Sequence, residues 1–146
     1  MTLSRHPLWV AACGAALAGL GGYAVGVAHA ASTAAPGEQL STIFEQKLAT
    51  VPGKRLVAMT VDYAPGGASA AHHHPETAEI FAYVVSGAVK SKVNDGPETV
   101  YKAGQFWYEP PGSFHGVSAN ASTSEPARIL AVIVAGDDPV ITPTTR

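Results

Sequence analysis

Apolar and polar residues alternate over short stretches along most of this chain after residue 50. In RLVAMTVDYAPGG (55–67), Val57, Met59, Val61 and Tyr63 alternate with smaller or more polar neighbours, and Pro-Gly-Gly ends the run. Successive side chains of a β-strand point to opposite faces of the sheet, so this period of two predicts a strand with one buried face.

Further short segments follow the same rule, and each one ends at Gly, Pro or Asn. They are EIFAYVVSG (79–87), AVKSKVNDG (88–96), ETVYKAG (98–104), QFWYEPPG (105–112), FHGVSAN (114–120) and RILAVIVAG (128–136). Strands at intervals of about 8–12 residues, separated by turn residues, predict an all-β sandwich or barrel. Only LSTIFEQKLAT (40–50) is ambiguous, because it fits either a helix face or an edge strand.

The same alternation predicts which aromatic and apolar side chains fill the core. We expect Met59, Val61, Phe81 and Tyr83 to face inward, and the run 106–108 (Phe-Trp-Tyr) to alternate between core and rim.

The first thirty residues have the pattern of an export signal. Arg5 precedes an apolar run over residues 8–27, and Ala28-His29-Ala30 fits a cleavage site. We expect cleavage after Ala30 and a periplasmic or secreted protein; an uncleaved anchor is the alternative, because the run is long enough to cross a bilayer. The remaining chain then divides into a linker (31–38), a β-barrel domain (39–138) and a tail (139–146).

Composition narrows the chemistry that the mature chain can carry. The sole cysteine, Cys13, lies in the predicted signal, so the mature part has neither disulfides nor thiolate ligands. Losing Arg5 leaves eight basic against eleven acidic residues, a net charge of −3. That balance argues against nucleic acid or an anionic membrane as a partner, and we expect no stable membrane association after cleavage.

The histidines of HHHPETAE (72–79) are the strongest chemical signal. On a strand, His72 and His74 share one face and His73 takes the other. His115 follows a Pro-Pro-Gly turn that can aim it from a neighbouring strand, and Glu79 offers an anionic fourth ligand. Two imidazoles on one strand and a third from elsewhere can hold a metal at about 2.0–2.2 Å. The alternatives are a solvated histidine tract and an ordinary surface or core histidine at 115.

Two ordered motifs carry a resemblance to the cupin superfamily. The segment 66–87 resembles the first cupin motif, G-x5-H-x-H-x3,4-E-x6-G, and the segment 104–120 resembles the second, G-x5-P-x-G-x2-H-x3-N. The resemblance covers about residues 55–135 and implies a double-stranded β-helix, or jelly-roll barrel. It also implies one metal ion, held by His72, His74, Glu79 and His115.

One departure from the family pattern puts the carboxylate in question. Seven residues separate Glu79 from Gly87, where the family has six, so the family's glutamate falls at Ile80. Either a bulge near Ala82 absorbs the extra residue, or Glu79 faces away and three histidines and water remain. Glu76 is a weaker candidate, since Pro75 interrupts the strand. Asn120 also comes one place late.

The remaining carboxylate near the second motif is Glu109, in YEPPG. It lies on the strand that leads to His115, where it could support the metal ligands, but we expect it to be a solvated residue of the turn.

Similarity to quercetinase-like cupins implies a mononuclear-metal oxygenase acting on a small organic molecule, with Glu79 doubling as a catalytic base. A metal-dependent isomerase or lyase and a non-catalytic binding protein are the alternatives. Zn or Cu is expected if loading follows export, while Fe, Mn or Ni also suit the ligands. Segments 128–136 and 40–50 predict sheet pairing in a homodimer.

Overall fold

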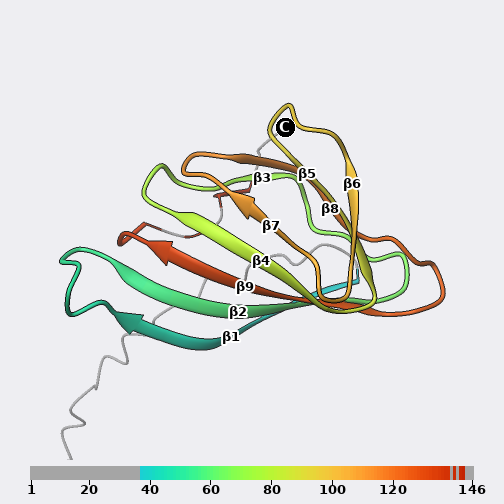
Figure 1. Cartoon of the computed structure of the whole chain (residues 1–146), viewed down its shortest axis with the longest axis horizontal. Helices are drawn as coiled ribbons and strands as arrows, with labels where there is room; N and C mark the ends of the chain where they lie inside the picture. The colour runs from blue at the N-terminus through green and yellow to red at the C-terminus, as the bar shows by residue number, and fades with distance from the viewer. Residues whose placement is uncertain (1–36, 139, 141, 144–146) are drawn as a thin grey trace, which may run out of the picture. The chain divides into compact units, whose positions relative to one another are not determined.

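The computed structural model describes residues 37–138, 140 and 142–143, which form ten β-strands in two antiparallel sheets (Figure 1). The predicted all-β fold is therefore confirmed. The export segment, its cleavage after Ala30 and most of the linker lie outside the described residues. Among the residues that the structure does describe, none belongs to a helix long and apolar enough to span a membrane.

Each sheet has five strands. The first sheet has the order β1-β2-β9-β4-β7. Its strands are β1 (Glu38–Lys47), β2 (Arg55–Tyr63), β9 (Ala127–Ala135), β4 (Glu79–Ser86) and β7 (Phe106–Glu109). The second has the order β10-β3-β8-β5-β6. Its strands are β10 (Thr142–Pro143), β3 (His72–His73), β8 (Phe114–Asn120), β5 (Ala88–Val93) and β6 (Thr99–Lys102). In this arrangement β10, from the predicted tail, pairs with β3.

The ambiguous segment 40–50 belongs mainly to β1, at the edge of the first sheet. Its register against β2 shifts between Thr42 and Phe44, so the strand bulges there. The edge-strand alternative is the correct one, because pairing with β2 satisfies the backbone on one side of this segment.

The core follows the alternation that the sequence predicts on β2, where every second residue from Val57 to Tyr63 is buried. Strand β9 lies between β2 and β4 and buries alternate residues in the same way. The buried apolar set comprises Val57, Met59, Val61, Tyr63, Ala78, Ile80, Ala82, Val84, Val89, Trp107, Ala127, Ile129, Ala131, Ile133 and Ala135.

Strand β4 faces the opposite way from our expectation. Ile80, Ala82 and Val84 are buried, whereas Phe81 and Tyr83 are 42% and 37% exposed on the outer face. The prediction that these two aromatics belong to the core is therefore wrong. The prediction for Met59 and Val61 is confirmed, as is the alternation around Trp107, which is buried between exposed neighbours.

The interior is apolar on one side and polar on the other. Most of the apolar core comes from the first sheet. By contrast, most of the buried polar side chains belong to the second sheet or lie at the ends of its strands: His72, His74, Ser91, Ser113, His115, Ser118 and Asn120. Buried polar groups are costly unless they find partners. A wall of them inside a small domain indicates a functional site.

Two glycines of the motifs form turns between strands: Gly87 lies between β4 and β5, and Gly104 lies between β6 and β7. Gly87 and Gly104 both have a positive φ, of 73° and 88°. A Cβ on Gly87 would lie 2.6 Å from the Pro126 carbonyl oxygen, whereas nothing lies within 4 Å of one on Gly104. We expect Gly104→Ala to lower the free energy of unfolding by about 1–2 kcal/mol through left-handed strain alone. Gly87→Ala should cost at least about 1 kcal/mol more, because its Cβ meets backbone.

Urea unfolding at equilibrium measures both losses from the shift in midpoint. Equal losses in the two variants would show that the close approach at Gly87 has no energetic consequence.

Candidate metal centre

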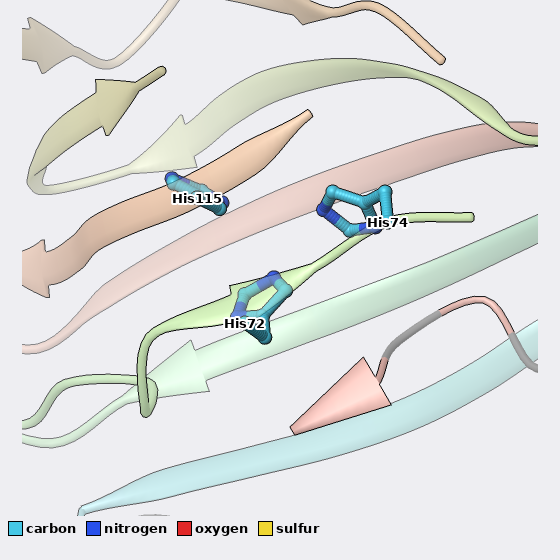
Figure 2. A group of neighbouring side chains, drawn as sticks. All are labelled: His72, His74 and His115. Atoms are coloured by element: carbon cyan, nitrogen blue, oxygen red, sulfur yellow. The ribbon is translucent and has the colours of Figure 1, made fainter. Parts of the chain in front are cut away.

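The structure brings His72, His74 and His115 together inside the domain. His72 on β3 is the direct cross-strand partner of His115 on β8, and His74 follows β3 immediately (Figure 2). Their relative exposures are only 7%, 6% and 4%. One ring nitrogen of each lies within 4.8 Å of those of the other two. His73 points the other way, is exposed and packs against Phe114, as the period of two predicts.

Backbone carbonyls fix how two of these rings present their nitrogens. His72 Nδ1 lies 2.8 Å from the Ala70 carbonyl oxygen, and His74 Nδ1 lies 2.8 Å from that of Val140. A carbonyl oxygen only accepts, so each Nδ1 carries the proton and donates. The Nε2 atom of each neutral ring is then left with a free lone pair. Metal-binding histidines are held by such hydrogen bonds from the other ring nitrogen.

Burial keeps two of the rings neutral. It lowers the pKa of His115 to about 4 and the pKa of His72 below its ordinary value. His115 Nε2 also lies 2.9 Å from the hydroxyl of Ser91 on β5. A neutral imidazole is the form that binds a metal, so neither ring has to lose a proton first at neutral pH.

A buried carboxylate completes the group. Glu109, at the end of β7, is 3% exposed. Its Oε2 lies 2.8 Å from His74 Nε2, and its Oε1 lies 3.3 Å from His115 Nδ1. Trp107 Nε1 donates a hydrogen bond to Oε1 over 2.9 Å. The expectation that Glu109 is a solvated turn residue is therefore wrong.

Glu109 and His74 shift one another's pKa values toward the charged forms. Burial alone would raise the pKa of Glu109, but the hydrogen bond with His74 and the nearby His115 and His74 hold it below its usual value. Likewise, burial would lower the pKa of His74, yet the hydrogen bond and negative charge of Glu109 raise it. The carboxylate is thus ionised at neutral pH and attracts a cation to the histidines.

The structure does not bring Glu79 to the histidines, which corrects the expectation that it is a ligand and base. Its side chain lies on the exposed face of β4, where it accepts a hydrogen bond of 2.8 Å from the Tyr108 hydroxyl. The register between β4 and β9 is regular from Glu79 to Val84 and shifts only between Val84 and Ser86. No bulge near Ala82 turns the residue inward. Glu76 is exposed as well.

Sequence reasoning considered Glu109 as a supporting residue but preferred a solvated one, although one signal favours the buried position. Trp107 and Glu109 are two residues apart on one strand, so a buried Trp107 implies an inward Glu109. The adjacent Pro-Pro-Gly turn argued for solvent instead. Asn120, one place late for its motif, supports the fold: its side-chain amide donates to the Ala64 and Glu125 carbonyl oxygens.

Comparison with known proteins agrees with this architecture. The family model described as "Cupin domain" matches residues 59–133, which hold both histidine segments. No curated protein matches the sequence significantly.

Similar solved structures share the fold at low sequence identity. A Klebsiella pneumoniae subsp. pneumoniae MGH 78578 protein with a double-stranded β-helix domain is 22% identical, over 76% of this chain and 87% of that one (TM-score 0.60). An oxalate oxidase in complex with glycolate is 24% identical, over 73% and 55% of the two chains (TM-score 0.57). KdgF from Halomonas sp. is 21% identical, over 70% and 83% (TM-score 0.55). This chain thus spans about half of the oxalate oxidase.

Proposed function

This chain belongs to the cupin superfamily, and on that premise we propose that it is an exported metalloprotein that acts on a small organic molecule. One divalent transition metal would be held by His72, His74 and His115. The observation that carries this proposal is the convergence of three buried ring nitrogens, two of them on rings oriented by backbone carbonyls. The donor set fits, because neutral imidazoles suit Zn, Cu, Fe and Ni.

The reaction that we propose is oxygenase-like. A metal held by the three histidines would supply Lewis-acid and redox chemistry for a small substrate and oxygen. The protein's own residues hold the histidine rings in one tautomer and bury the site in the domain interior. Glu109 is the carboxylate that forms ion pairs with two of these rings, at 2.8 and 3.3 Å, while Glu38 acts on His72 through its charge. Among the described residues, the site has no separate acid–base pair aimed at a substrate, and this favours redox chemistry or binding over hydrolysis.

A pocket one side chain away from the histidines is a candidate place for the substrate. It has a volume of about 140 Å³ and is lined by Ser91, which contacts His115, and by Trp107, which contacts Glu109, but by none of the three histidines. Pockets for drug-sized ligands usually measure about 300–1,000 Å³. We therefore propose a small substrate.

Export would decide which metal is bound. A chain that folds after leaving the cytoplasm acquires its metal outside, where Cu and Zn bind most tightly to a nitrogen and oxygen site. We expect native material to carry mainly Zn or Cu, measured by elemental analysis together with sequencing of the mature N-terminus. Stoichiometric Fe or Mn, or a chain that retains residues 1–30, would contradict this loading route.

Oxygen consumption tests the reaction class. We expect the loaded protein to consume oxygen with a member of a panel of catechols, flavonols and diketones, and to turn nothing over anaerobically. Turnover without oxygen would indicate an isomerase or lyase instead. Melting shifts with the same compounds and no turnover would indicate a binding protein.

A homodimer is a further proposal, and the topology limits how it can form. Strand β9 is bonded to β2 and β4 on its two sides, so residues 128–136 have no free edge. Strand β1 lies at the edge of its sheet and remains able to pair with a second copy. Light scattering decides between this dimer and a monomer.

A further inference from the structure

The described part of the chain places a second-motif carboxylate beside the histidines, where the cupin pattern supplies one from its first motif. We propose that Glu109 is the anionic ligand of the metal, supplied by β7 in place of β4. The inference deepens the proposed function and rests on the metal that it assumes.

The strand register shows how Glu109 can take the place of the glutamate that the cupin pattern has in its first motif. Counted back from Gly87, the family's glutamate falls at Ile80, which is buried and apolar here. Ile80 on β4 is the direct cross-strand partner of Glu109 on β7, and both side chains point inward. Partners in an antiparallel pair have Cβ atoms about 4.5–5.5 Å apart. The Glu109 carboxylate therefore occupies nearly the same part of the interior as a glutamate at position 80 would, but comes from the neighbouring strand.

The two oxygens of Glu109 have different surroundings. Oε1 accepts the hydrogen bond from Trp107 Nε1, which holds the carboxylate in place. Oε2 is buried and faces His74 Nε2 at 2.8 Å. Because His74 Nδ1 donates to the Val140 carbonyl oxygen, the two facing atoms can share either a second ring proton or a metal ion that takes its place. An ion bound there would have both atoms as ligands, which is the arrangement we propose.

The separations suit a shared metal ion. Ligands about 2.1 Å from one metal lie about 3.0–3.4 Å apart in octahedral or tetrahedral geometry. Glu109 Oε2 lies 2.8 Å from His74 Nε2, slightly below this range, and the other oxygen, Oε1, lies 3.3 Å from His115 Nδ1. Binding through Oε2 would need Oε2 and His74 Nε2 to separate slightly around the ion. The charge also fits, since an ionised carboxylate with three neutral imidazoles partly neutralises a divalent ion.

Matched glutamine variants test the assignment on the full chain. Glu109→Gln keeps the shape of the side chain and removes its charge, while Glu79→Gln does the same on the outer face. Zinc affinity is measured by competition with a chromophoric chelator, and folding by circular dichroism. We expect Glu109→Gln to weaken zinc binding about 100-fold or more, and Glu79→Gln to leave it within about twofold of wild type.

A crystal structure of the zinc-loaded wild type distinguishes a ligand from a residue that only positions the histidines. We expect a distance of about 2.0–2.2 Å from Glu109 Oε2 to zinc. A distance beyond about 3 Å, or equal affinity in the two glutamine variants, would overturn the assignment while leaving the three-histidine site intact. If wild type binds no zinc, copper, iron, manganese or nickel, the proposed function itself fails, and the assignment fails with it.

Discussion

His72→Ala and His115→Ala should each weaken zinc binding roughly 1,000-fold, or about 4 kcal/mol, and leave the dialysed protein without stoichiometric metal. Tetrahedral zinc sites in small domains bind with about 10–16 kcal/mol, so an equal share for one of four ligands is about 2.5–4 kcal/mol. Both rings are buried and directly opposite each other across β3 and β8, so no neighbouring side chain replaces a lost nitrogen. Elemental analysis after dialysis and chelator competition measure the loss.

His73→Ala is the matched control for this experiment. His73 is adjacent to both first-motif histidines in sequence, but it faces outward and packs against Phe114. We expect its zinc affinity to match wild type. A loss at His73 as large as that at His72 would mean that the tract binds metal as a solvated cluster, and the interior site would be refuted.

The success of sequence reasoning on the histidines and its failure on Glu79 have one physical cause. The period of two is reliable within one strand, which is why His72 and His74 share a face and His73 does not. The alternation does not tell which residues of the next strand face inward when a loop intervenes. The loop from Pro75 to Ala78 separates the histidines from β4. Glu79, Phe81 and Tyr83 have the same position in the alternation, so the two predictions fail together, and all three residues are on the outer face.

The role of Glu109 could not be predicted with the same ease, because energetics argued against it. A carboxylate beside a turn usually remains in water, since burying an unpaired charge costs several kcal/mol. Here two histidines and the Trp107 indole compensate that cost. The indole lies on the same strand as Glu109, whereas His115 lies in the second sheet and His74 directly follows one of its strands, so both come close only when the domain folds. The sequence alone shows the residues but not this cluster of partners.

Trp107 links the apolar core to the candidate metal centre, and its removal should have the largest effect on stability. The ring is 5% exposed, stacks near Tyr101 at 4.9 Å between centroids and donates to Glu109. Truncation to alanine leaves a cavity and an unsupported carboxylate, so we expect Trp107→Ala to lower the free energy of unfolding by about 3–5 kcal/mol. Urea unfolding of the metal-free protein measures this loss.

Two further variants separate packing from hydrogen bonding. Trp107→Phe keeps most of the ring volume and removes the Nε1 donor, so it should cost about 1–3 kcal/mol, the penalty for a buried group left without its partner. Phe106→Ala, on the neighbouring residue with a side chain that is 60% exposed, should cost less than about 1 kcal/mol. If Trp107→Phe were as stable as wild type, the indole would not be holding Glu109, and the carboxylate would be positioned by the histidines alone.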